Sequence, residues 1–242
     1  MEKDFDGRVA LVTGASRGIG YQLAKQLGSR GAHVIALART VGGLEDLDDE
    51  IKSAGGQTTL VPVDLTDFDA LDRLGAAIFE RWKKLDIFIG NAGMLGTLAP
   101  LGHIKPKDFE KVMAVNVTAN WRLIRSLDPL LRQSDAGRAL FLTASQVRSC
   151  TAFWGLQTMS KAAVEAMART WANESLQTRM KINLVDPGPT RTGLRAKAMP
   201  GEPPEKLPHP SEITGDLLAL VTPDVKATGQ LFDRVSREWH SF

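Results

Sequence analysis

Apolar residues along this chain fall into short runs that alternate with longer stretches of mixed polarity. The runs are rich in Val, Ile, Leu and Ala and end at small or polar residues, a pattern typical of strands buried on both faces. We expect strands at 9–12, 33–39, 59–65, 85–93, 138–145 and 180–188, with a short last one near 229–232. Helical patterns fill the intervals, from the glycine turn to about Arg30 and at 43–54, 67–83, 106–129, 154–176 and 211–221.

This alternation of strand and helix predicts an α/β fold, a doubly wound parallel sheet with helices on both faces. The length of 242 residues suits one large domain of this kind, spanning residues 1–242. Only the tail departs from the alternation. Residues 193–210 are rich in proline, so we expect no regular element there and instead a flexible flap beside a site.

A glycine-rich turn joins the first strand to the first helix, in the sequence TGASRGIG with Gly14, Gly18 and Gly20. Glycine accepts positive φ and lets the backbone approach a ligand, while the first N–H groups of the helix point at any anion there. The spacing differs from the G-x-G-x-x-G fingerprint and from the P-loop, which needs a following Gly-Lys-Ser/Thr. We interpret the turn as a phosphate loop, the alternative being a tight turn that binds nothing.

The other expected strands also end at small or polar residues. In open parallel sheets, ligands bind beyond the carboxyl ends of the strands. The residues at those ends are Ala38-Arg39, Asp64-Leu65, Asn91-Ala92-Gly93, Thr143 to Ser145, and Pro187-Gly188. Agreement among all of these ends indicates a binding site far more strongly than the glycine turn alone.

Composition narrows the class of partner. The chain is 43% hydrophobic and 24% charged with a net charge of +2, and its basic residues are scattered, which argues against nucleic acid or an anionic membrane surface. The only cysteine, Cys150, can form no internal disulfide, and no apolar run reaches the length of a membrane span. We therefore expect a cytoplasmic protein, with a small-molecule substrate and without a metal site.

Six motifs occur in a fixed order along almost the whole chain. They are TGASRGIG, DLTD at 64–67, NAG at 91–93, Asn116-Val117, SKAA at 160–163 and PGPTRT at 187–192. In this order and spacing the chain resembles the short-chain dehydrogenase/reductase family. The resemblance implies a single Rossmann-type domain that binds NAD or NADP and moves hydride between the nicotinamide and an alcohol or ketone. It also implies a homodimer or homotetramer.

The choice of cofactor rests on two arginines. An NAD enzyme usually places an acidic residue at the end of the second strand, whereas a 2′-phosphate requires cations. Here that position is Arg39, and Arg17 lies in the glycine loop, so we expect NADP(H) rather than NAD(H). The alternative is that Arg39 is a solvated loop residue. The expected cofactor-binding residues, several by resemblance, are Gly14, Ser16, Arg17, Gly18, Ile19, Gly20, Arg39, Asp64, Leu65, Asn91, Ala92, Gly93, Lys161, Pro187, Gly188 and Thr192.

The expected catalytic helix departs from the family pattern. The family uses a tyrosine four residues before a lysine, one helical turn apart, and Lys161 is present within SKAA. The tyrosine position, however, is Gln157, and an amide cannot give up a proton near neutral pH. The only tyrosine, Tyr21, lies in the first helix and away from the reaction centre.

Two further positions are compared with the family pattern. The family serine usually lies thirteen residues before the tyrosine, which here is Ala144, so a one-residue loop deletion would bring Ser145 into that role. The hydroxyl of Thr143 is also near this position in the sequence. Asn116 matches the asparagine that organises a water beside the lysine; the alternative is an ordinary amide on a helix surface.

The missing phenol leaves few proton sources. Lys161 could act through water if burial lowered its pKa, and His103 lies on a segment that borders the substrate cleft in the family. Met94, Leu95, Leu98, Leu194 and Met199 suggest an apolar substrate chamber. Phe153, Trp154, Met159, Met167 and Trp171 are interpreted as helix packing, and Cys150 as inert.

Two functions of different class follow. The first is an NADP-dependent oxidoreductase of carbonyl or alcohol substrates, with impaired or altered catalysis because Gln157 replaces the tyrosine. The second is a catalytically inactive dinucleotide-binding protein that acts as a partner subunit or sensor. An altered form of an active enzyme is a third possibility. The expected catalytic set for the first function is Asn116, Ser145, Gln157 and Lys161.

Overall fold

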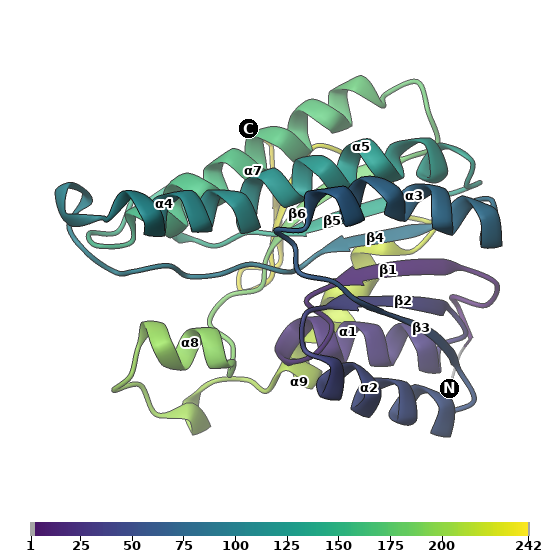
Figure 1. Ribbon diagram of the computed structural model, residues 1–242, viewed down its shortest axis with the longest axis horizontal. Helices are drawn as coiled ribbons and strands as arrows, with labels where there is room; N and C mark the ends of the chain where they lie inside the picture. The colour runs from purple at the N-terminus through teal and green to yellow at the C-terminus, as the bar shows by residue number, and fades with distance from the viewer. Residues whose placement is uncertain (1–2, 242) are drawn as a thin grey trace.

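The structure is a computed structural model that describes residues 3–241. Within them, eight strands form one sheet in the order β3-β2-β1-β4-β5-β6-β7-β8 (Figure 1). The strands are β1 (Val9–Thr13), β2 (His33–Ala38), β3 (Gln57–Pro62), β4 (Ile87–Gly90), β5 (Arg138–Leu142), β6 (Lys181–Asp186), β7 (Leu231–Asp233) and β8 (Glu238–His240). All neighbours pair in parallel except β7 and β8, which pair antiparallel. The predicted α/β fold with a parallel sheet is confirmed.

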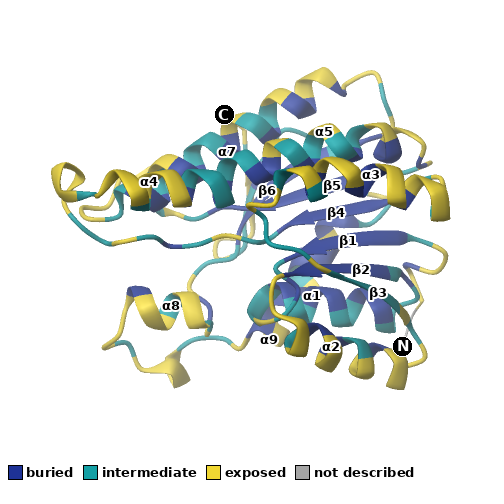
Figure 2. Ribbon diagram, in the orientation of Figure 1, coloured by how far each residue is buried: buried dark blue, intermediate teal, exposed yellow. Residues whose placement is uncertain are grey.

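The helices cover both faces of the sheet. They are α1 (Gly18–Ser29), α2 (Val41–Ser53), α3 (Phe68–Trp82), α4 (Pro106–Met113), α5 (Ala119–Arg132), α6 (Gln146–Ser149), α7 (Gly155–Glu174), α8 (Gly193–Ala198) and α9 (Pro210–Leu218). One apolar core lies under α1, α2 and α9, and a second lies under α3, α5 and α7. Figure 2 shows the sheet buried between these two layers.

The strand order indicates where a ligand site is expected in this sheet. The chain runs from β1 outward to β3 and then returns to place β4 on the other side of β1, so the topology reverses between β1 and β4. In doubly wound sheets this switch point is where a crevice opens at the carboxyl ends of the strands. The loops after β1, β4 and β5 therefore meet at one edge.

Several elements differ from the sequence-based expectation. The helix expected to end near Pro129 continues to Arg132, because Pro129 lies in an amphipathic segment whose apolar face is buried. A π-helical turn at Ala114–Thr118 interrupts this long helix. The strand β3 begins and ends earlier than predicted, and neither the four-residue α6 nor the last strand β8 was predicted. Short elements of three or four residues carry too little periodicity to be recognised.

The proline-rich segment contains regular structure, contrary to the expectation for 193–210. It includes the helix α8 and a 3₁₀ turn at Pro204–Lys206. The Thr192 hydroxyl caps α8 by accepting from Arg195 N, and the Arg195 guanidinium makes two 2.6 Å bonds to the Glu202 carboxylate. Proline was therefore compatible with short helices because it falls at their first positions and in the links between them. The flexibility of the flap stays a prediction.

No helix among residues 3–241 is long and apolar enough to cross a membrane.

Candidate functional site

The glycine loop after β1 lies against the end of β4. Gly14 and Gly18 have φ of +68° and +63°, which glycine adopts without strain. A Cβ on Gly20 would lie 2.3 Å from Asn91 Nδ2 and 2.5 Å from Gly14 O. Only glycine fits at this close approach, and it leaves the backbone of the loop open to a ligand.

Two helix N-termini meet at this loop. The α1 helix begins after Arg17 and α2 begins after Thr40, and neither residue caps its helix through a side-chain hydrogen bond. Close packing brings them together, since a Cβ on Gly43 would lie 2.5 Å from Ser16 O. Uncapped N–H groups at helix N-termini attract anions. The residues present therefore fit the phosphates of a dinucleotide.

The adenosine end of the predicted site contains Arg39 and Asp64. Arg39 lies beyond β2 with a side chain 71% exposed, and its guanidinium reaches Asp64 at 3.4 Å. The backbone N–H and hydroxyl of Thr66 donate to Asp64 and, with Arg39, hold the pKa of its carboxyl below its usual value. Leu65 follows Asp64 and is half-buried. Arg39 is thus held only weakly and stays accessible.

The NAG segment links the glycine loop to the predicted catalytic residues. Asn91 N and Ala92 N both donate to Thr13 Oγ1, at 3.1 and 3.0 Å. A Cβ on Gly93 would lie 3.4 Å from Asn116 Oδ1 and 3.6 Å from Lys161 Nζ. The cofactor-binding and catalytic predictions therefore converge at Gly93.

Lys161 is buried on the inner face of α7. Its residue exposure is 6%, and its Nζ donates to Leu142 O at the end of β5, at 2.6 Å. Burial lowers the pKa of Lys161 to about 8, while the charge of Glu165 opposes that shift. An ammonium with such a pKa can release and regain a proton close to neutral pH.

Gln157 lies one helical turn before Lys161 and is equally buried, at 6% exposure. Its Oε1 has no hydrogen-bond partner among the described residues. Ser160 Oγ donates to the backbone oxygen of Gln157, at 3.3 Å. A buried amide oxygen without a protein partner costs stability unless a water or a ligand accepts that role.

Asn116 lies in the π-helical turn and not on a helix surface, since it is only 1% exposed. Its side chain accepts from Met94 N at 2.8 Å and donates to Met94 O at 3.0 Å and to Ser160 Oγ at 2.9 Å. Its backbone oxygen accepts from Asn120 Nδ2, at 2.6 Å. Asn116 therefore joins the loop after β4 to α7.

Ser145 differs from the other predicted catalytic residues because its side chain is not buried beside Lys161. It is exposed at the start of α6, and no hydrogen bond joins its side chain to Gln157 or Lys161 within residues 3–241. The neighbouring Thr143 is buried, and its hydroxyl donates to the carboxylate of Glu165. Neither hydroxyl is therefore paired with Gln157.

The loop after β6 closes the site and is fixed by the C-terminal hairpin. Gly188 has φ of +69° and donates its N–H to Asp186 Oδ1 at 3.0 Å. Arg234 Nε donates to Pro187 O at 2.6 Å. Thr192 lies across from the glycine loop, its methyl 3.6 Å from a Cβ placed on Gly18.

A charged cluster behind Lys161 was not predicted. Glu165 lies one turn after Lys161 on α7, and Arg148 on α6 donates to Asp186 at 2.8 Å and to Asp233 at 3.2 Å. Burial raises the pKa of Glu165, and the nearby Arg148 opposes that rise. The only signal in the sequence was the spacing of 157, 161 and 165 on one helical face.

Other side chains considered from the sequence lie outside this arrangement. Burial and the Glu50 carboxylate raise the pKa of Tyr21 to about 12. His103 and Cys150 are exposed. Trp171 is buried and donates to Asp128 at 2.7 Å, in agreement with helix packing, whereas Phe153 is 58% exposed.

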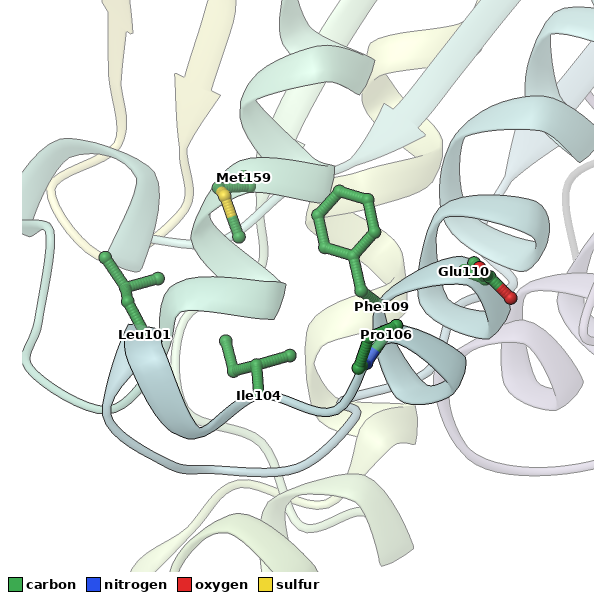
Figure 3. Close-up of a pocket in the computed structure, with 6 residues that line it drawn as sticks. All are labelled: Leu101, Ile104, Pro106, Phe109, Glu110 and Met159. Atoms are coloured by element: carbon green, nitrogen blue, oxygen red, sulfur yellow. The ribbon is translucent and has the colours of Figure 1, made fainter.

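A shallow apolar pocket of about 380 Å³ lies between α4, α7 and the turn at Leu101–His103 (Figure 3). Its lining residues are Leu101, Ile104, Pro106, Phe109, Glu110 and Met159. None of the residues predicted for the substrate chamber lines it. Neither Gln157 nor Lys161 lines it either.

The model of the family described as short chain dehydrogenase matches residues 8–203. The chain belongs to the short chain dehydrogenase family. A relative from Escherichia coli K12 named "Uncharacterized oxidoreductase YciK" is 38% identical over 230 residues, covering 93% of this chain and 91% of that protein. A rhamnolipid-biosynthesis 3-oxoacyl-[acyl-carrier-protein] reductase from Pseudomonas aeruginosa is 36% identical, covering 75% of this chain and 72% of that protein.

Solved structures of other short chain dehydrogenases match over nearly the whole chain. A protein from Shigella flexneri described as a short chain dehydrogenase complexed with NADP gives a TM-score of 0.93 at 36% identity, covering 97% of this chain and 100% of that one. A similar protein from Escherichia coli CFT073, complexed with NADPH, gives 0.90 at 37% identity, with 97% and 99% covered. The chain is thus a short-chain-dehydrogenase-type oxidoreductase with a Rossmann-like sheet.

Proposed function

We propose that this short chain dehydrogenase binds NADP(H) and interconverts a carbonyl compound and its alcohol, with slow or altered catalysis because Gln157 occupies the tyrosine position. One observation carries the proposal. Lys161 Nζ is buried beside Gly93 and Asn116, at the edge where the glycine loop ends, and burial lowers its pKa to about 8. The proposed acid therefore lies next to residues that we propose to bind the cofactor.

NADP(H) is favoured over NAD(H) by the charges around the end of β2. Arg39 and Thr40 follow that strand, and the uncapped N-terminus of α2 begins beside them. A 2′-phosphate would find a guanidinium and free N–H groups there, whereas an NAD site would present a carboxylate. The NADP and NADPH complexes of the similar structures support the same choice.

The chemistry of the reaction divides between the cofactor and the protein. A bound nicotinamide would supply the hydride for the carbonyl carbon. Lys161 would supply the proton for the carbonyl oxygen and become a neutral amine, and in the oxidation it would take the proton back. Gln157 can orient the substrate through its amide but can neither give nor take that proton. Asn116 would keep the loop at Met94 in place against α7.

The second candidate function is a dinucleotide-binding partner subunit or sensor without turnover. The chemistry of Gln157 favours it, since by the family resemblance this residue takes the position of the acid, and an amide cannot give up a proton near neutral pH. Under that proposal the cofactor still binds and no substrate is reduced. For the first function, we propose an apolar substrate. We also propose that the protein is a homodimer or homotetramer, which the exposed apolar side chains of Leu101, Phe109 and Met159 support.

The test compares the two cofactors by thermal shift. NADPH should raise the melting temperature of the protein more than NADH at equal concentration, because the guanidinium groups proposed to bind it, Arg39 and Arg17, would attract the additional phosphate. Replacing Arg39 with Ala should abolish the difference between the cofactors. The control is Arg73→Ala, which removes an exposed arginine on α3. An equal or larger shift with NADH would refute the assignment of NADP(H).

A further inference from the structure

Three of the buried polar side chains of α7 lie at a regular spacing along one face. Gln157, Lys161 and Glu165 follow one another at intervals of four residues, and their exposures are 6%, 6% and 4%. Side chains at this spacing lie above one another along a helix. Glu165 is therefore the next side chain along the face from the proposed proton donor.

Glu165 is tied to the sheet beneath the helix. The hydroxyl of Thr143, directly after β5, donates to its Oε1. The preceding residue, Leu142, supplies the carbonyl oxygen that accepts from Lys161 Nζ. The end of β5 thus holds both charged side chains through consecutive residues.

The charges that face Glu165 come from four other places. Arg169 lies one turn further along α7, Arg148 on α6, Asp186 at the end of β6, and Asp233 on β7 bonds the same Arg148. Burial raises the pKa of Glu165 and Asp186 adds to the rise, whereas the Thr143 hydrogen bond, Arg148 and Arg169 favour the carboxylate. The hydrogen bond from Thr143 and the two arginines thus act against the burial that disfavours a negative charge here.

We infer that Glu165 is a positioning residue for Lys161, whose carboxylate keeps the buried lysine in the protonated form that donates to the substrate. The inference rests on the proposed function, in which Lys161 is the acid. An ammonium buried without a counter-charge would lose its proton near neutral pH and could then no longer act as a donor. Glu165 supplies this counter-charge from one helical turn away. Its carboxylate forms no direct ion pair with Lys161, so the Lys161 ammonium can still pass its proton to a substrate.

The test measures the titration of Lys161 directly and needs no turnover. The Nζ signals of protein labelled with ¹⁵N and ¹³C at lysine are followed by NMR against pH, and Lys161→Met identifies the signal of Lys161. In Glu165→Gln, which keeps an oxygen for Thr143, the pKa of Lys161 should fall by about one unit or more, as expected when an opposite charge one helical turn away is removed. Glu165→Asp should leave it close to the value of the unchanged protein.

The matched control is Glu174→Gln, the same substitution at an exposed position of α7. It should leave the titration of Lys161 unmoved. If Glu165→Gln fails to fold, Thr143→Val removes the hydroxyl without removing a charge and should lower the pKa of Lys161 by a smaller amount. An unmoved Lys161 signal in Glu165→Gln or in Thr143→Val would overturn the inference.

A kinetic measurement separates this inference from the proposed function. If a ketone is reduced, the descending limb of kcat against pH should move to lower pH in Glu165→Gln, with KM nearly unchanged. If no ketone is reduced but the NMR shift occurs, the proposed function fails while Glu165 still sets the charge of Lys161. If reduction proceeds and neither the signal nor the limb moves, the inference alone fails.

Discussion

At the scale of single residues, Gln157 and Lys161 differ in whether they can serve as the proton donor. The amide of Gln157 can form hydrogen bonds but cannot give up a proton near neutral pH, and its Oε1 lacks a partner among the described residues. Lys161 is buried nearby, and its lowered pKa of about 8 makes it an acid of useful strength. In the sequence, the resemblance to the family motif pointed to both residues, and their catalytic roles stay predictions. The sequence could not reveal Glu165, because burial and the contact with Thr143 depend on the folded sheet.

The first test at this scale introduces a tyrosine at position 157 and asks whether its phenol can act as the acid. Gln157→Tyr should raise the rate of reduction of a panel of ketones at least about tenfold, since acid catalysis by a positioned side chain is typically worth about 10²–10⁴ in rate. Gln157→Phe is the control, because it adds the ring without the hydroxyl and should give no gain. The measurement is NADPH oxidation under saturating cofactor. No gain in a Tyr variant that binds cofactor would argue against a simple loss of the acid.

At the scale of elements, the glycine loop and the π-helical turn position the site. The first could be predicted from the sequence because glycine spacing between a strand and a helix has a direct conformational meaning. The turn at Ala114–Thr118 could only be suspected from Asn116, since the hydrogen bonds that favour it involve Met94 and Ser160, far away in the sequence. Short elements such as α6 could not be predicted, because four residues are too few to show a helical pattern of apolar positions.

The close approach at Gly20 gives a prediction for this scale. Gly20→Ala should weaken NADPH binding at least about tenfold and destabilise the protein by about 1–3 kcal/mol, because its Cβ would meet Asn91 Nδ2 at 2.3 Å and Gly14 O at 2.5 Å. Gly215→Ala in α9 is the control, since nothing lies within 4 Å of its Cβ. It should be neutral or stabilising by about 0.5–1 kcal/mol. Cofactor titration and thermal melts measure both, and unaltered binding in Gly20→Ala would contradict the role of the loop.

At the scale of the whole molecule, strand order brings the loops after β1, β4, β5 and β6 to one edge. Alternating patterns along the sequence were enough to predict the sheet and its two helical layers. They could not predict the hairpin of β7 and β8, whose Arg234 fixes the loop at Pro187 through a contact distant in sequence. The location of the proposed dinucleotide site and the burial of Lys161 therefore depend on the topology as much as on the motifs.

The most direct test of this account is the pH dependence of a single turnover. The protein is loaded with NADPH and mixed with an excess of an apolar ketone, and loss of NADPH absorbance is followed between about pH 6 and 10, a range that brackets the ordinary and lowered pKa values of lysine. Because reduction requires protonated Lys161, the rate should be constant at low pH and fall above about pH 8. Lys161→Met should remove both the activity and the limb. A rate that stays level across this range in the unchanged protein would contradict the assignment of Lys161 as the proton donor.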